Sequence, residues 1–275
     1  MKVAIRIWYM LFVLYLSPVK AQYANLHYDP MNRIATQDYH LAMAVYEIQN
    51  ARPDKAIKIL KKNRTPSRKY FESFYLYGLA YKQKSDYKRA IHYFSKATHD
   101  KSTSLPAFFE RGNCYMAQKL FGQAVFDYNR VIAIDSTFLP AYNNRAYARI
   151  RNFGDALFPA RQLQMARKDL EKVLRLNDNP EDDKKHLYFF NLGMLDLYLS
   201  EYYQAKLNFD QSIAIDSTYA KAYYFRGMSN FLRKAYYEAA DDFNIAEQMG
   251  YSTLNTPEFL RIIDLVKAYY DSLAD

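Results

Sequence analysis

Cysteine is nearly absent from this sequence, since its 275 residues include only Cys114. A single cysteine excludes an internal disulfide framework, and it also excludes any site that needs two cysteine ligands. We expect Cys114 to act as a small buried hydrophobe.

Glycine is also scarce, at seven residues. The sequence has no glycine-rich phosphate loop and no Gly-x-Ser-x-Gly turn, and its five histidines form no zinc-binding motif. Adjacent carboxylates such as Asp241 and Asp242 are typical of solvated charges. We therefore expect a protein that is not an enzyme, with no metal and no cofactor. Low glycine with plentiful Ala, Leu, Lys and Gln favours helix.

Long apolar runs are missing except at residues 7–16, and these ten residues are too few for the ~20 that span a bilayer. Two cations precede the run, a Ser-Pro pair ends it, and residues 19–21 place small side chains before a cut at Gln22. This order is typical of a secretory signal peptide. An uncleaved membrane anchor is the alternative.

Cleavage predicts an exported protein, periplasmic or secreted, that loses residues 1–21 and begins with a lead-in segment at 22–36. Removal of Lys2, Arg6 and Lys20 lowers the formal net charge from +9 to +6. That charge favours acidic partners weakly and does not single out nucleic acid, which is not an expected partner. No span is expected in the mature chain.

Small and aromatic residues recur with a period of 34. One small residue of each period is Ala44, Gly78, Gly112, Ala146, Gly193 or Gly227. A second small residue follows as Ala56, Ala90, Ala124, Ala166, Ala205 or Ala239, with Leu60, Phe94, Tyr128, Leu170, Phe209 or Phe243 four residues later. Beside these two series, "IAIDSTF" at 132–138 returns as "IAIDSTY" at 213–219.

The pattern resembles the tetratricopeptide repeat, and "FYLYGLAYKQKSDYKRAIHYFSKA" at 74–97 is a close match. The resemblance implies an all-α fold, a right-handed α-solenoid of stacked helix-turn-helix hairpins over residues 37–253. The predicted units are 37–70, 71–104, 105–138, 139–180, 186–219 and 220–253. Residues 254–275 are expected to form a C-terminal capping helix. The start at Ala-Gln and the Tyr-rich repeats look like exported repeat proteins of Bacteroidetes-type bacteria.

Spacing within each unit agrees with this resemblance, because the repeated small and aromatic residues have helical periodicity. One hairpin cannot bury its own apolar face, so the units must stack. The repeated phrase is then one recurring corner, the last turn of a helix followed by the turn into the next unit. The extra residues fall within 152–165 and at 181–185, and the first insertion either lengthens a hairpin or forms part of a binding face.

The resemblance further implies a concave groove lined by the first helix of each hairpin, chiefly at positions 2, 5, 9, 12 and 13 of the unit. We expect it to bind a peptide segment or protein partner, as a scaffold or adaptor in the cell envelope. The predicted groove residues are Tyr75, Leu79, Phe109, Asn113, Asn143, Asn144, Tyr147, Phe190, Asn191, Met194, Tyr224 and Met228.

One family subtype, the carboxylate clamp of chaperone adaptors, is not expected here. Asn113 and Asn144 match two of its five residues, but Phe109, Leu187 and Asn191 replace the other three.

The alternative function is polyanion or nucleic-acid binding through the basic run 58–69 and the series Arg111, Arg145 and Arg226. A structural role for the arginines competes with it. An aspartate, Asp135 or Asp216, stands ten residues before each of the last two arginines, which predicts salt bridges between neighbouring units.

Overall fold

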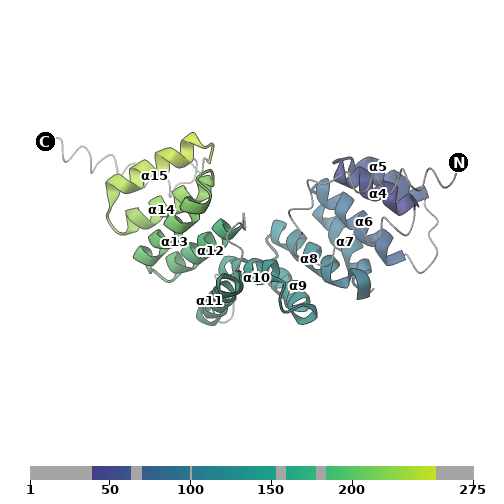
Figure 1. The fold of residues 1–275 in the computed structure, drawn as a ribbon, viewed down its shortest axis with the longest axis horizontal. Helices are drawn as coiled ribbons and strands as arrows, with labels where there is room; N and C mark the ends of the chain where they lie inside the picture. The colour runs from purple at the N-terminus through teal and green to yellow at the C-terminus, as the bar shows by residue number, and fades with distance from the viewer. Residues whose placement is uncertain (1–38, 63–69, 100, 153–158, 178–183, 252–275) are drawn as a thin grey trace. The chain divides into compact units, whose positions relative to one another are not determined.

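The computed structural model describes residues 39–62, 70–99, 101–152, 159–177 and 184–251, which form twelve helices and no strand. The helices are α4 (Tyr39–Gln49), α5 (Pro53–Lys62), α6 (Tyr70–Gln83), α7 (Tyr87–Ala97), α8 (Lys101–Ala117), α9 (Phe121–Ile134), α10 (Leu139–Arg151), α11 (Pro159–Leu176), α12 (Lys185–Tyr198), α13 (Tyr202–Ile215), α14 (Ala220–Leu232) and α15 (Tyr236–Gln248) (Figure 1). The signal peptide, the lead-in segment and the capping helix of the sequence prediction lie outside the described residues.

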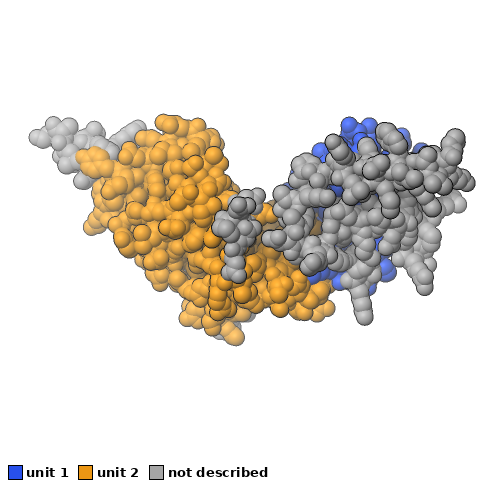
Figure 2. Space-filling view, viewed as in Figure 1, with its two compact units in different colours: residues 1–107 blue, residues 108–275 orange. Residues whose placement is uncertain are grey.

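The chain divides into two compact units, residues 1–107 and 108–275 (Figure 2). The first contains the hairpins α4/α5 and α6/α7, and the second contains α9 to α15. The boundary falls within α8, which carries Pro106 in its interior. All the described helices are α-helices joined as successive hairpins, so the all-α helical-repeat fold predicted from the sequence is confirmed.

Glycines allow the two helices of a hairpin to approach closely. A Cβ atom on Gly78 would lie 2.5 Å from the Phe94 ring, and one on Gly193 would lie 2.6 Å from the Phe209 ring. The same contact recurs between Gly112 and Tyr128 and between Gly227 and Phe243. These aromatic rings are buried, so each glycine creates the space that its partner ring fills.

In the five hairpins whose connecting turn the structure describes, that turn contains one residue with positive φ. These residues are Ala51, Ser85, Lys119, Ser200 and Lys234, with φ between 53° and 64°. In the α12/α13 hairpin, the Ser200 N–H donates to the Leu197 carbonyl and the Glu201 N–H donates to the Asp196 carbonyl, at 3.0 and 2.8 Å. This is the Schellman pattern, which satisfies the last carbonyls of the first helix.

The repeated phrase forms the same corner twice, as predicted. After α9 the Asp135 carboxylate accepts hydrogen bonds from the Thr137 N–H and hydroxyl, at 2.8 and 2.7 Å. After α13 the Asp216 carboxylate accepts from the Thr218 N–H and hydroxyl, at 2.9 and 2.6 Å. The hydrogen bonds from Thr218 lower the pKa of Asp216. Both aspartates thus close a turn between hairpins.

The predicted salt bridges between Asp135 and Arg145 and between Asp216 and Arg226 were wrong, because those carboxylates are turned toward the threonines. The three arginines instead pair with aspartates inside their own hairpins, and one of these is Asp242, which is buried and not solvated as the sequence pattern predicted. The N–O distances are 2.6 Å for Arg111–Asp127, 2.6 Å for Arg145–Asp169 and 2.5 Å for Arg226–Asp242.

Side chains of preceding units also hold two of these arginines. The Arg145 guanidinium donates to the Asn129 amide oxygen at 2.6 Å, and that of Arg226 donates to Asp210 at 2.8 Å. Burial lowers the pKa of Arg226, but the hydrogen bonds and charges of Asp242 and Asp210 outweigh it and hold the pKa above its ordinary value. The arginine series is a set of structural ion pairs rather than a basic stripe.

Candidate functional site

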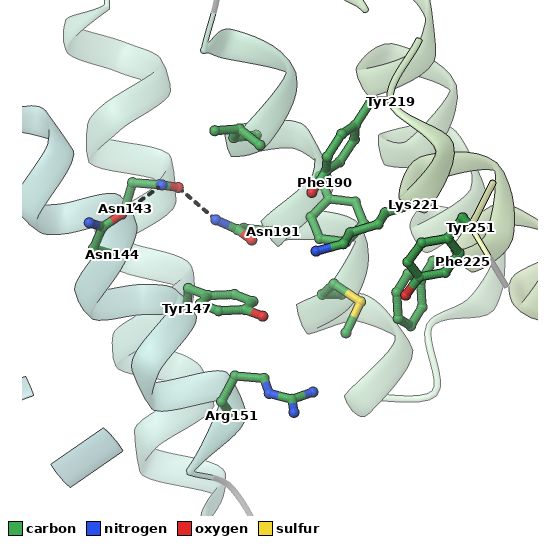
Figure 3. A pocket seen from close by; sticks show the side chains of 12 residues that line it. Asn143, Asn144, Tyr147, Arg151, Phe190, Asn191, Tyr219, Lys221, Phe225 and Tyr251 are labelled. Atoms are coloured by element: carbon green, nitrogen blue, oxygen red, sulfur yellow. Dashed lines mark hydrogen bonds between the residues drawn. The ribbon is translucent and has the colours of Figure 1, made fainter. Parts of the chain in front are cut away.

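The second compact unit contains a pocket of about 430 Å³, formed mainly by the first helices α10, α12 and α14 (Figure 3). Its lining residues are Asn143, Asn144, Tyr147, Arg151, Leu187, Phe190, Asn191, Met194, Tyr219, Lys221, Phe225 and Tyr251. Six of the twelve predicted groove residues are in this set. The structure therefore brings half of the predicted residues together at one site.

Helical periodicity explains which side chains reach the pocket. Asn143, Tyr147 and Arg151 follow one another at intervals of four along α10, so they share a face. Leu187, Asn191 and Met194, at intervals of four and three, share a face of α12. One face of each of these helices therefore lines the site, as the sequence resemblance implies.

An aromatic cluster makes one wall of the pocket. The Phe190 ring lies 5.1 Å from that of Tyr219 and 5.6 Å from that of Phe225, both edge to face. Phe190 and Met194 are each 5% exposed. This wall is packed and apolar, which is the usual lining of a site that binds side chains of a ligand.

A chain of side-chain amides forms a polar surface beside the wall. The Asn191 amide donates to Asn143 at 2.8 Å, and the Asn144 amide donates to Asn113 at 3.1 Å. The Tyr128 hydroxyl donates to the same Asn113 oxygen at 2.9 Å. The four asparagines predicted to line the groove thus form hydrogen bonds with one another. Each amide has two donor hydrogens and two lone pairs, so these bonds leave capacity for a ligand.

The charged groups of the lining are both cations. Arg151 at the end of α10 and Lys221 in α14 are exposed, and the lining includes no aspartate or glutamate. In Figure 3 both side chains extend toward the space beside Tyr147. Tyr147, Tyr219 and Tyr251 add phenol groups, and burial raises the pKa of Tyr219, so this phenol stays protonated at neutral pH.

The other six predicted groove residues do not line the pocket, although Asn113 and Tyr224 contact the lining residues Asn144 and Tyr251. Tyr75 and Leu79 belong to the first unit, and Phe109, Asn113, Tyr224 and Met228 belong to the second. The aromatic members pack on the second helix of their own hairpin, with ring centroids 5.8 Å apart for Tyr75–Phe94, 6.0 Å for Phe109–Tyr128 and 5.5 Å for Tyr224–Phe243. These rings therefore contribute to the hairpin cores, and their role in binding stays a prediction.

Six lining residues were missed by sequence reasoning: Arg151, Leu187, Tyr219, Lys221, Phe225 and Tyr251. A signal existed for three of them. Leu187 and Lys221 occupy position 2 of their units and Arg151 occupies position 13, both of which the resemblance implies as groove positions. Tyr219 and Tyr251 come from the turns beside α14 and α15, where the repeat pattern gives no such indication.

Metal-binding and membrane-spanning features are both absent from the part of the chain that the structure describes. It contains no cluster of His, Cys, Asp and Glu that could hold a metal ion. Its helices include none with both the length and the apolar character needed to cross a membrane.

Residues 71–98 and 105–138 match the family model of the tetratricopeptide repeat. They contain the hairpin α6/α7 and most of α8/α9. No curated protein matches the chain in sequence.

Solved structures with a similar fold include PilF of Pseudomonas aeruginosa, at 18% identity and a TM-score of 0.58, over 74% of this chain and 86% of that one. TTC0263, a thermophilic TPR protein of Thermus thermophilus, is 15% identical with a TM-score of 0.55, over 72% and 97%. A chain of the APC/C hetero-tetramer Cut9–Hcn1 is 16% identical with a TM-score of 0.63, over 84% and 43%. At these identities the likeness is one of fold. Residues 71–98 and 105–138 are thus similar to tetratricopeptide repeats, and the chain has the all-α helical-repeat fold of these solved structures.

Proposed function

We propose that this chain is a non-enzymatic protein-interaction scaffold of the cell envelope that binds a peptide segment of its partner in the pocket between α10, α12 and α14. Tetratricopeptide repeats generally serve protein interaction, and a solved neighbour of similar fold is part of a hetero-tetramer. The observation that carries the proposal is the pocket itself. It joins an apolar wall to amide and phenol groups, and this combination suits a peptide with side chains and backbone to bind.

Tyr147 offers the sharpest test of the pocket. Its side chain lines the pocket and is only partly buried, so truncation removes a contact surface without opening the hairpin core. Tyr147→Ala is expected to weaken partner binding by about 1–3 kcal/mol, or roughly tenfold or more. The measurement is recovery of the partner from an envelope extract on immobilised protein, followed by titration calorimetry with the recovered partner.

Tyr237→Ala is the matched control, because Tyr237 is 47% exposed on α15 and does not line the pocket. It should leave partner affinity unchanged. Equal losses for the two variants, or no loss for Tyr147→Ala, would place the binding site elsewhere.

The arginine series does not support the polyanion alternative, because each of these arginines forms an ion pair with an aspartate. The remaining candidate for polyanion binding is the basic run 58–69. Lys61 and Lys62 of this run are exposed at the end of α5, and 63–69 lie outside the described residues. A double change, Lys61→Glu with Lys62→Glu, should leave partner binding intact. Loss of binding in this variant, with a steep salt dependence in the original chain, would favour the alternative.

Export to the periplasm or the medium is the second part of the proposal, in line with the resemblance to exported repeat proteins of Bacteroidetes-type bacteria. The order of charged, apolar and small residues before Gln22 supports it. The chain isolated from its native host is expected to begin at Gln22, as read by N-terminal sequencing of the envelope and secreted fractions. A chain that retains Met1 in the soluble cytoplasmic fraction would refute export.

A further inference from the structure

We propose that the pocket selects peptides that carry a carboxylate next to an apolar side chain, with the carboxylate held by Arg151 and Lys221. This inference rests on the proposed function and adds the chemistry of the partner. The sequence pattern of the carboxylate clamp fails at three of its five positions. The site proposed here instead combines Arg151, at the end of α10, with Lys221, at the start of α14, and the clamp pattern does not contain this pair.

The charge of the lining carries the first step. Two cations border the pocket and none of its lining residues is an acid. Three other arginines of the neighbouring hairpins differ from Arg151, since Arg145, Arg149 and Arg226 each form an ion pair with a buried aspartate. Among the described residues, neither Arg151 nor Lys221 has an ion pair with an acid, and a carboxylate of a ligand is the group that complements their charge.

The geometry around the cations carries the second step. Arg151 also lies over the Phe121 ring, at 5.9 Å from its centroid, which orients the guanidinium without neutralising it. Its charge also reaches the Tyr251 phenol, where it opposes the rise that burial causes in the pKa of Tyr251. A carboxylate between Arg151 and Lys221 could accept hydrogen bonds from both cations and from the phenols of Tyr147 and Tyr251.

The apolar wall carries the third step, because it lies beside the cations in the same pocket. Phe190, Met194 and Phe225 line the pocket, and an aliphatic or aromatic side chain in the pocket would pack against them. A volume of about 430 Å³ accommodates a short peptide segment rather than a folded surface. The partner chemistry is therefore an apolar residue adjacent to a carboxylate, from an acidic side chain or from a chain terminus.

The test is selection from a randomised peptide library displayed on phage, against the whole mature chain. Selected peptides are expected to be rich in Asp or Glu beside an apolar residue and to require Tyr147. For a synthetic copy of a selected peptide, Arg151→Gln and Lys221→Gln should each raise the Kd about tenfold, as for a lost charge-assisted hydrogen bond. Lys168→Gln is the matched control, because Lys168 is exposed on α11 away from the pocket, and it should change nothing.

Two peptide variants identify the source of the carboxylate. If an acidic side chain binds, exchanging Asp for Asn or Glu for Gln should cost about as much as Arg151→Gln. If the chain terminus binds, amidation of the terminus should cost that amount instead. Both outcomes support the inference.

Peptides that need Tyr147 but are insensitive to Arg151→Gln and Lys221→Gln would overturn the inference and leave the proposed function standing. Peptides that bind independently of Tyr147, or a library that yields no binder, would count against both. Both cations are exposed, so unchanged thermal unfolding of the two variants should show that the fold is retained.

Discussion

Replacing Gly227 with leucine is expected to lower the free energy of unfolding by about 2–4 kcal/mol. Even a Cβ atom at this position would lie 2.8 Å from the Phe243 ring and 3.1 Å from the Asp242 Cβ. Phe243 is 3% exposed and is packed against Tyr224, Met228 and Phe231. The larger side chain must therefore separate α14 from α15, and the separation would also disturb the ion pair between Asp242 and Arg226.

Gly122→Ala provides the control, since a Cβ on this α9 residue meets nothing within 4 Å. Alanine in an exposed helical position should leave stability unchanged or raise it by roughly 0.5–1 kcal/mol. Both variants are compared by urea unfolding followed by circular dichroism. If Gly227→Leu unfolds at the same urea concentration as the original chain, the close approach of α14 and α15 is wrong.

The hairpins could be predicted because one offset recurs across them. Each glycine and the ring that covers it are 16 residues apart, as in Gly78 with Phe94 and Gly193 with Phe209. Such a contact needs a small residue and an aromatic residue at fixed positions of each hairpin. The two residue types therefore recur at a fixed spacing in the sequence. Helix spacing and repeat length were enough to find it.

The same offset also holds for the ion pairs, and here the sequence interpretation went wrong. Asp127 follows Arg111 by 16 residues, and Asp242 follows Arg226 by 16. For Asp169 the separation from Arg145 is 24 residues, since the insertion of eight lies between them. Because of this insertion, Arg145 and Asp169 do not show the 16-residue offset, and the sequence pattern predicted pairing with Asp135 and Asp216 instead.

Only half of the residues that line the pocket could be predicted from the sequence, because the lining depends on how the side chains of neighbouring units pack. In four of the hairpins an aromatic at position 5 packs on an aromatic of the second helix, as Phe190 does on Phe209 at 5.7 Å. The hairpin α10/α11 has Asn143 and Leu170 at these two positions. The pocket lies beside α10, where Asn143 is part of its lining. Phe190 at position 5 both packs on Phe209 and lines the pocket, whereas Phe109 and Tyr224 at the same position do not line it, and repeat spacing does not specify this difference.

The second large effect is expected at Asp169, whose removal should cost about 3–5 kcal/mol of stability. Its carboxylate pairs with the guanidiniums of Arg145 and Arg149, at 2.6 and 2.5 Å. The Arg149 side chain is only 4% exposed, and burial together with the charge of Arg145 lowers the pKa of Arg149 against the pull of Asp169. Asp169→Ala would leave this cation buried without a counter-charge.

The control for this prediction is a surface pair, Lys84 with Asp54, whose carboxylate is 78% exposed. Asp54→Ala should cost no more than about 1 kcal/mol because water replaces the lost partner. Both variants are measured by urea unfolding, and equal costs would contradict the prediction.

A further variant separates the buried charge from simple loss of packing. Combining Arg149→Met with Asp169→Leu replaces the buried pair by apolar groups of similar size, and such replacements are often neutral or stabilising. Arg145 remains in this variant, but it keeps its hydrogen bond to Asn129 and has more contact with solvent than Arg149. The double variant should therefore unfold at a higher urea concentration than Asp169→Ala alone. If it is no more stable, the cost at Asp169 arises from lost packing and not from an unpaired charge at Arg149.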